Sequence, residues 1–386
     1  MKGYSDRLGE VQEYYFSKKL KEVQQLRESG KPIINMGIGS PDLPPDPSVI
    51  DALKNVADSP SAHGYQSYQG TAQLRNAMAE FYKRNYNVLL DPVSEVLPLM
   101  GSKEGIMHIS MAFLNEGDEV LVPDPGYPTY TSVTKLLNAK PVYYSLREDD
   151  HWEPDWHVLD QMDLSKVKLM WVNYPHMPTG AKGSEALFIR LVEFAKAHNL
   201  LLVHDNPYSF ILNDEPKSLL EISGAKDHAL ELNSLSKTFN IPGWRVGMLA
   251  GRKDYLQAVL RVKSNMDSGM FLGIQEGAVA ALKLDGSWMA EMNKVYEKRR
   301  ALVLRMTRLL RLDVEENTVG LFVWAKVPEG KTATEIVDQL LYDFDIFITP
   351  GLIFGSKGAS YVRFSLCVKE EQIDEAISRL KNYNKL

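Results

Sequence analysis

The 386-residue chain contains a single cysteine, Cys367, so it cannot form an internal disulfide bond. A chain without a disulfide framework is most simply placed in the reducing cytoplasm. No uninterrupted apolar run approaches the roughly 18 residues that a membrane-spanning helix needs. The first twenty residues are charged and have no apolar core of the signal-peptide kind. We therefore expect a cytoplasmic protein with no membrane partner.

Basic residues are outnumbered by acidic ones, 44 to 50, which gives a net charge of -6. A nucleic-acid partner usually demands a basic surface, so this balance argues against one. The eight histidines show no H-E-x-x-H spacing, and we predict no metal site. The glycine-rich pattern of a P-loop does not precede Lys237-Thr238, and Gly37-x-Gly39 lacks the third glycine of a dinucleotide-binding turn.

The length of the chain favours two domains rather than one core. Strand and helix patterns alternate across residues 46–284, which predicts an α/β fold with a mainly parallel sheet between helices. A long helical pattern at about Ser287–Leu310 would connect this part to a second unit. We predict a large cofactor-binding domain of residues 46–284 and a smaller α/β domain built from residues 1–45 and 285–386.

The segment 229–251 begins as an apolar strand and continues through Ser234, Ser236, Lys237 and Arg245. Hydroxyl groups and a guanidinium are suited to binding a phosphate. A lysine held among other cations and apolar neighbours has a lowered pKa and becomes a nucleophilic amine. An isolated S-x-S-K is most often a strand end with a solvated lysine, so the chemical interpretation depends on the other segments.

Two further strand ends carry polar groups. The run Val96–Met100 leads through a glycine turn into Ser102 and Lys103 at the start of a helix, where backbone N–H groups and the helix dipole favour a phosphate. The apolar run 200–203 continues to Asp205. A buried carboxylate needs a partner, and a protonated pyridine nitrogen would be one.

Tyr127 stands between two prolines, which would hold its ring rigidly for stacking on a flat heteroaromatic ligand. We expect Tyr130, three residues later, to be a core residue. Arg363 lies inside an otherwise apolar strand, where an unpaired arginine would be expensive to bury. A substrate carboxylate would give it a bidentate partner, and a structural salt bridge is the alternative.

Together these segments resemble the pyridoxal-phosphate-dependent aminotransferases of the aspartate aminotransferase superfamily, fold type I, class I/II. The motif S-x-S-K-x-x-x-x-x-G-x-R-x-G of that family matches at Ser234, Ser236, Lys237, Gly243, Arg245 and Gly247. The resemblance extends over nearly the whole chain. It implies that Lys237 forms a Schiff base with pyridoxal 5'-phosphate, and that the sheet of the large domain has seven strands.

The resemblance also assigns the cofactor contacts. Those to the phosphate come from Ser102, Lys103, Ser234, Ser236 and Arg245. The ring of Tyr127 would cover the pyridine ring, Asp205 would pair with its nitrogen, and Tyr208 of the D-x-x-Y motif would donate to its phenolic oxygen.

The substrate contacts follow in the same way. Arg363 would bind the α-carboxylate, in a region completed by Ile38, Gly39 and Asn173. The pattern Y-x-x-x-x-G-x-x-x-L-R begins at Tyr65, and in relatives the matching tyrosine reaches the cofactor phosphate of the other subunit. The resemblance therefore implies a homodimer with shared active sites.

Met177 departs from the family, whose common form has asparagine at this place and uses it to hydrogen-bond the phenolic oxygen of the cofactor. A thioether is a weak acceptor and cannot donate. Either His176 or Asn173 supplies the missing donor, or the phenolic oxygen has one partner fewer. We expect the missing donor to raise the pKa of the cofactor's imine.

These features predict an enzyme that moves an amino group from an L-amino acid to a 2-oxo acid. Gly-Ser-Lys-Glu-Gly at residues 101–105 and the N-Y-P turn at residue 173 are similar to the diaminopimelate aminotransferase branch. A carbon–sulfur lyase or a carboxylate-cyclising synthase on the same scaffold is the alternative. A non-catalytic pyridoxal-phosphate-binding regulator is disfavoured, because such proteins usually add a winged-helix domain and there is no room for one before residue 33.

Overall fold

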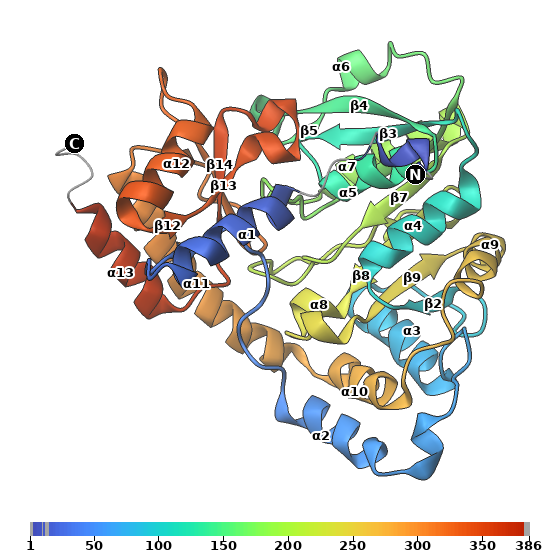
Figure 1. Ribbon diagram of the computed structural model, residues 1–386. Helices are drawn as coiled ribbons and strands as arrows, with labels where there is room; N and C mark the ends of the chain where they lie inside the picture. The colour runs from blue at the N-terminus through green and yellow to red at the C-terminus, as the bar shows by residue number, and fades with distance from the viewer. Residues whose placement is uncertain (1–2, 10, 12–14, 382–386) are drawn as a thin grey trace.

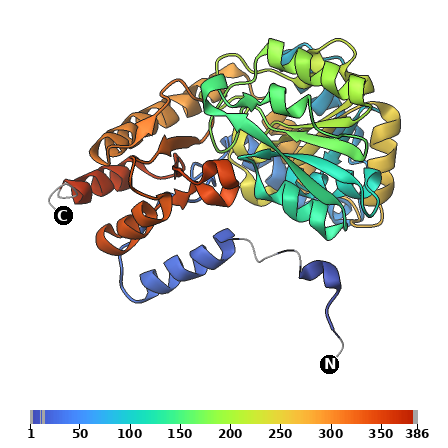
Figure 2. The same cartoon turned by 90° about the horizontal axis from the view of Figure 1, so that it is seen from above.

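The structure is a computed structural model that describes residues 3–9, 11 and 15–381. The chain forms a larger lobe around one extended sheet and a smaller lobe around a second sheet (Figure 1). Seen from above, helices cover the large sheet on both sides (Figure 2). The predicted α/β fold with a mainly parallel sheet is therefore confirmed.

Within the described residues, the large sheet has eight strands in the order β2-β9-β8-β7-β6-β3-β4-β5. Strands β3, β4, β6, β7 and β8 run parallel to their neighbours within this group, whereas β9 and β5 are antiparallel to the strands beside them. Their bounds are β2 (Val96–Leu99), β3 (Glu119–Asp124), β4 (Lys140–Arg147), β5 (Glu153–Pro154), β6 (Val167–Val172), β7 (Leu201–Asp205), β8 (Ala229–Ser234) and β9 (Gly247–Gly251). The predicted number of seven strands is wrong, because the two-residue β5 adds an eighth.

The central strands are buried on both faces, as their nearly continuous apolar character requires. In β7, Leu201 and Val203 belong to one apolar cluster and Leu202 to another, because successive side chains point to opposite faces. The same alternation separates Trp171 from Val172 in β6. The sheet is thus the middle layer between two cores.

Helices α4 (Ser102–Phe113), α5 (Pro128–Leu136) and α9 (Lys253–Lys263) contribute to the cluster on one face. Helices α3 (Ala72–Tyr86), α7 (Glu185–His198) and α10 (Leu272–Lys283) contribute to the cluster on the other face. Helix α2 (Pro47–Ala57) packs against α10. Local signals set the helix ends: Thr71 caps α3, since its Oγ1 accepts from the backbone N–H of Leu74 at 3.2 Å.

The second sheet is antiparallel, with the order β10-β11-β14-β13. Its strands are β10 (Asp313–Val314), β11 (Phe322–Lys326), β13 (Thr349–Pro350) and β14 (Tyr361–Ser365), and helices α12 (Ala333–Phe344) and α13 (Glu370–Leu380) accompany them. Strand β1 (Ile34–Asn35) pairs with β12 (Ile346–Phe347), so the N-terminal part of the chain joins the C-terminal part.

Helix α11 (Gly286–Leu309) connects the two lobes, close to the predicted limits of the long helix. From its middle, Arg299 donates to both carboxylate oxygens of Asp42, at 2.6 and 3.0 Å, and to the carbonyl of Leu366 at 3.0 Å. This buried arginine ties the segment before α2 to the residue that directly follows β14, the strand that carries Arg363. The domain limits at residues 46 and 284 stay a prediction.

The remaining elements are short or lie at the edge of the molecule. They are α1 (Tyr15–Glu28), α6 (Trp156–Leu159), α8 (Leu235–Thr238), η1 (Asp6–Leu8), η2 (Pro60–His63), η3 (Glu148–Asp150), η4 (Leu219–Glu221), η5 (Ala225–Asp227), η6 (Pro242–Trp244), η7 (Gly351–Phe354) and η8 (Ser356–Gly358). Of the helices in the described part of the chain, none combines the length and the apolar character needed to cross a bilayer.

Candidate active site

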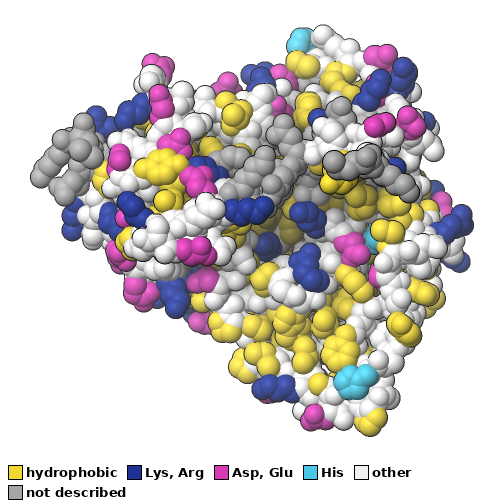
Figure 3. All heavy atoms as spheres, viewed as in Figure 1, with side chains coloured by type: hydrophobic (Ala, Val, Ile, Leu, Met, Phe, Trp, Pro, Cys, Tyr) yellow, Lys and Arg dark blue, Asp and Glu magenta, His cyan; other side chains and the backbone are white. Residues whose placement is uncertain are grey.

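A cavity of about 750 Å³ opens where the carboxyl ends of the central strands face the second sheet. In this region Lys and Arg side chains gather around a hollow in the molecular surface (Figure 3). Every predicted site residue except Tyr65 lines the cavity, namely Ile38, Gly39, Ser102, Lys103, Tyr127, Asn173, Asp205, Tyr208, Ser234, Ser236, Lys237, Arg245 and Arg363. Residues from both ends and the middle of the chain therefore meet at one place.

Lys237 stands in the short helix α8, directly after β8. Ser234 caps this helix by accepting from the backbone N–H of Ser236 at 3.2 Å, which fixes the direction in which Lys237 leaves the strand. The ammonium Nζ donates to the carbonyl of Gly39 at 2.6 Å. Burial lowers the pKa of Lys237, and the positive charges of Arg245 and Arg363 lower it further. A lowered pKa increases the fraction of neutral amine, which is the nucleophilic form of a lysine.

A second group of contacts lies where α4 begins. Gly101 has a positive φ of 95°, and a Cβ there would lie 2.2 Å from Nη2 of Arg245. A Cβ on Gly247 would lie 2.6 Å from the backbone N of Ser102. The glycines therefore allow the guanidinium and β9 to approach the free N–H groups at the start of the helix, a geometry that favours an anion.

The charges in this region fit a phosphate. Burial and the nearby positive charge of Arg245 lower the pKa of Lys103. Two cations held near each other are stabilised by an anion between them. The buried Oγ of Ser236 has no hydrogen-bond partner among the described residues. A phosphate would supply acceptors for this hydroxyl, the two cations and the helix N–H groups, so the donor set fits pyridoxal phosphate.

Asp205 ends strand β7 and is 5% exposed. Its Oδ2 accepts from the hydroxyl of Tyr130 at 2.8 Å, whereas the buried Oδ1 has no partner within the described residues. Burial raises the pKa of Asp205 to about 6, even though the bond from Tyr130 and the neighbouring His204 lower it. An unpartnered carboxylate oxygen at a cavity wall is suited to a cationic ligand atom, such as a protonated ring nitrogen.

Tyr130 was predicted to be a core residue, and it is fully buried. Its ring stacks on Trp171, with centroids 4.9 Å apart and planes 4° from parallel. Its hydroxyl nevertheless binds the Asp205 carboxylate, so the sequence analysis missed this polar contact. Tyr130 lies in the first turn of α5, three residues after Tyr127 in the sequence pattern P-x-Y-P-x-Y of residues 125–130.

Arg363 is 4% exposed in β14. Its Nη2 donates to the carbonyl of Gly37 at 2.8 Å, and its guanidinium carbon lies 3.9 Å from the ring centroid of Phe322 and 4.7 Å from that of Phe354. The two aromatic rings hold the guanidinium at the cavity wall through cation–π contacts. Its Nη1 lies 3.3 Å from Sδ of Met177, so the residue that departs from the family touches this arginine.

The structure bears on the two donors considered for the phenolic oxygen. His176 is absent from the cavity lining, and its Nδ1 lies 2.8 Å from the hydroxyl of Thr179. Asn173 does line the cavity; its Nδ2 donates to the carbonyl of Asp205 at 2.5 Å, and its Oδ1 accepts from the backbone N of Met177 at 2.8 Å. Of these two side chains, Asn173 is the one that lines the cavity, and its amide nitrogen carries a second hydrogen beside the one given to Asp205.

Tyr65 follows η2 and lies away from the cavity lining of its own chain. Its side chain is 93% exposed. The role predicted for Tyr65 in a second subunit stays a prediction.

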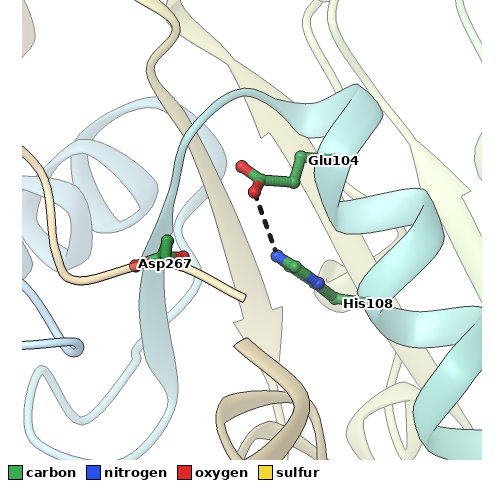
Figure 4. Close-up of side chains that lie close together, drawn as sticks. All are labelled: Glu104, His108 and Asp267. Atoms are coloured by element: carbon green, nitrogen blue, oxygen red, sulfur yellow. Dashed lines mark ion pairs between the residues drawn. The ribbon is translucent and has the colours of Figure 1, made fainter. Parts of the chain in front are cut away.

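A charged cluster lies beside the first turn of α4. Nε2 of His108 is 3.4 Å from Oε1 of Glu104, and Asp267 faces them from the loop after α9 (Figure 4). Lys263 Nζ lies 2.8 Å from Asp267, and both side chains are about 95% buried or more, with 3% and 5% exposed. Lys263 thus supplies a positive charge directly beside the Asp267 carboxylate of this cluster.

The mainly parallel sheet is that of the fold type I enzymes, and the lysine at the end of β8, the paired cations and the carboxylate of β7 meet at one cavity beside it. The family model "Aminotransferase class I and II" matches residues 31–380. The chain therefore belongs to the class I and II aminotransferases, a pyridoxal-phosphate-dependent family, and it is an enzyme that transfers amino groups. The resemblance and the aminotransferase activity predicted from the sequence are confirmed.

Named relatives agree with this assignment. The LL-diaminopimelate aminotransferase of Halothermothrix orenii is 40% identical over 380 residues, which is 98% of each chain. The enzyme of the same name from Aquifex aeolicus is 38% identical over 381 residues, again 98% of each chain. Substrate-bound BacF from Bacillus subtilis is similar in structure with a TM-score of 0.94 and 35% identity, covering 100% of this chain and 98% of that chain. An aminotransferase from Staphylococcus aureus gives a TM-score of 0.90 and 32% identity, covering 99% and 100%.

Proposed function

We propose that this aminotransferase binds pyridoxal 5'-phosphate through Lys237 and takes its amino group from LL-diaminopimelate or an L-amino acid of similar chemistry, with a 2-oxo acid as acceptor. The observation that carries the proposal is that Lys237, Asp205, Arg245 and Arg363 line one cavity of about 750 Å³. Relatives named for LL-diaminopimelate that match over 98% of the chain support the substrate class.

In this proposal each wall of the cavity holds one part of the cofactor. Ser102, Lys103, Ser234, Ser236 and Arg245 hold the phosphate. Tyr127 covers the ring, Asp205 pairs with the ring nitrogen through Oδ1, and Tyr208 and Asn173 face the phenolic oxygen. The cofactor, when bound, supplies an electron sink for negative charge at the substrate α-carbon.

Lys237 has a second role once the substrate amine has displaced it. Burial lowers the pKa of Lys237, so a larger fraction of the amine is neutral near pH 7 than for an exposed lysine. A neutral amine can take the proton from the substrate α-carbon as a general base and return it as a general acid. Arg363 orients that carbon by binding the α-carboxylate in a two-pronged contact.

We further propose a cytoplasmic homodimer. Several large hydrophobic side chains are exposed near the loop of Tyr65, including Tyr65 at 93%, Tyr68 at 44% and Met266 at 57%. Hydrophobic side chains also gather over the lower part of the face in Figure 3. Exposed apolar surface of this kind is typical of protein interfaces, and Tyr65 would reach the phosphate of the partner's cofactor. The single cysteine, Cys367, is buried, consistent with a reducing compartment.

The proposal is tested by reconstitution and trapping. Purified protein given pyridoxal phosphate should turn yellow, and borohydride should fix the adduct on Lys237, as read by peptide mass spectrometry. Lys237→Ala should lose transamination by at least about 10²-fold, the lower range for acid–base groups. Lys54→Ala, an exposed control at 68%, should keep it. A colourless protein without a lysine adduct would end the proposal.

The substrate is tested by an amino-donor screen at fixed 2-oxoglutarate, followed through the colour of the cofactor. LL-diaminopimelate should react faster than aspartate, phenylalanine or methionine. Pyruvate and ammonia released from cystathionine without a 2-oxo acid would instead indicate the lyase alternative. Sedimentation of the active enzyme as a monomer would contradict the shared site.

A further inference from the structure

The second tyrosine of the P-x-Y-P-x-Y motif holds a polar position beneath the cavity. Tyr130 lies in the first turn of α5 and is fully buried. Its ring is fixed by stacking on Trp171 at 4.9 Å and by an edge contact with Tyr127 at 5.6 Å. Its hydroxyl is 2.8 Å from Oδ2 of Asp205. The ring contacts therefore aim the hydroxyl at one carboxylate oxygen and at no backbone group.

The surroundings of the carboxylate make this single bond important. Within the described residues, Tyr130 is the one donor to the side chain of Asp205, and Oδ1 remains unpartnered at the cavity wall. His204, the preceding residue, points elsewhere: its ring nitrogens lie 2.8 Å from Glu231 and 2.7 Å from the carbonyl of Tyr174. Tyr208 is a further titratable neighbour of Asp205.

We propose that Tyr130 is a positioning residue for amino transfer, which keeps the Asp205 carboxylate ionised and turned so that Oδ1 faces the cavity. The inference rests on the proposed role of Asp205 as the partner of a cationic ring nitrogen. It gives the hydroxyl of Tyr130 a role, because stacking on Trp171 requires only the ring.

The ionisation of the two groups agrees with this role. Burial raises the pKa of Tyr130 well above its ordinary value, and the negative charge of Asp205 raises it further, so the phenol stays protonated and always donates. Burial raises the pKa of Asp205 to about 6, and the bond from Tyr130 acts in the opposite direction. Without the hydroxyl, a larger fraction of the carboxyl would be neutral at pH 7 and unable to form an ion pair.

The test removes the hydroxyl and keeps the ring. Tyr130→Phe preserves the stacking on Trp171, and Tyr144→Phe is the matched control, because Tyr144 is 3% exposed and donates to the carbonyl of Trp171 at 2.7 Å. The ¹³C NMR signal of the Asp205 carboxyl, assigned with Asp205→Asn, is titrated in cofactor-free protein. Tyr130→Phe should raise its pKa by about one unit, a tenfold change in the acid dissociation constant, whereas Tyr144→Phe should leave it unchanged.

The holoenzyme gives a second readout. In Tyr130→Phe, kcat should fall about twofold at pH 7 and about fivefold at pH 6, with KM for the amino donor nearly unchanged, and the activity should return at higher pH. 3-Fluorotyrosine at position 130 is nearly isosteric with tyrosine and a stronger hydrogen-bond donor, so it should lower the pKa of the Asp205 carboxyl. This substitution replaces Tyr130→Phe as the test if that variant does not fold. Equal titrations in the Tyr130→Phe and Tyr144→Phe proteins would overturn the inference. This titration needs no cofactor, so it is separate from any failure of the proposed function.

Discussion

The approach of Arg245 to Gly101 offers a sharp test of the phosphate site. A Cβ at residue 101 would lie 2.2 Å from Nη2 and 2.8 Å from Cζ of Arg245, and the residue has a φ of 95°. Gly101→Ala therefore acts twice. The positive φ should lower the free energy of unfolding by about 1–2 kcal/mol. The methyl group should also push the guanidinium away from the start of α4.

The loss of this cation is the larger effect on the ligand. A hydrogen bond to a charged group contributes about 1.5–3 kcal/mol, so losing one should weaken pyridoxal phosphate binding about 10- to 100-fold. Gly243→Ala is the control, because Gly243 has no atom within 4 Å of an added Cβ. Equilibrium dialysis of the cofactor against each apoprotein gives the dissociation constants. Wild-type affinity in Gly101→Ala, or equal weakening by Gly243→Ala, would refute the geometry.

Two further substitutions test a hydrogen-bond donor in the cavity and a buried ion pair beside α4. Met177→Asn adds an amide donor beside the phenolic oxygen, so the absorption band of the bound cofactor should titrate at lower pH, and an unmoved band would contradict the hypothesis. Lys263→Met leaves the buried Asp267 carboxylate without its ammonium and should lower the free energy of unfolding by about 3–5 kcal/mol. Lys294→Met, whose ion pair with Glu291 is exposed, should change it by less than about 1 kcal/mol. Urea denaturation that gave equal losses for both lysines would argue against the buried pair.

The parts of the fold that could be predicted from sequence are those with a continuous apolar signal. The run Leu201–Val203 has a side chain in each core, which is why it is apolar throughout. Strand β5 (Glu153–Pro154) has no such signal, because two residues that pair at the edge of β4 bury little. Its existence depends on where the chain returns to the sheet, and the local pattern of these two residues does not signal that.

The candidate site divides in the same way. The lysine, carboxylate and arginines could be predicted because their chemistry is carried by residue type, and the strand ends bring them to one cavity. The hydrogen bond from Tyr130 to Asp205 was not predicted, since a buried aromatic ring is typical of a core and the direction of its hydroxyl depends on packing against Trp171. The contact between Met177 and Arg363 also joins residues far apart in the chain, and spacing alone does not predict it.

The carboxylate of Asp205 should destabilise the cofactor-free protein, and the pH dependence of the free energy of unfolding gives the size of this effect. Burial raises the pKa of Asp205 to about 6, above the usual value of 3.8. Below pH 3.8 the group is protonated in both the folded and the unfolded state, so it contributes nothing. Between about pH 4 and 6 the unfolded state has lost its proton and the folded state retains it, so stability falls as pH rises. A difference of about two pKa units between the folded and the unfolded state lowers the free energy of unfolding by at most about 3 kcal/mol above pH 6.

Asp205→Asn should therefore raise the free energy of unfolding of the apoprotein by up to about 3 kcal/mol at pH 8 and leave it nearly unchanged below pH 4. Asp124→Asn is the opposite control: Asp124 is 7% exposed but accepts bonds from the Ser356 hydroxyl at 2.6 Å and the Lys357 backbone N–H at 2.9 Å, so its replacement should destabilise. Calorimetry of the two variants at pH 4 and pH 8 separates these cases. A protein that loses stability at pH 8 on Asp205→Asn would show that the carboxylate is already satisfied without a cationic ligand, and pairing with a ring nitrogen would lose its physical reason.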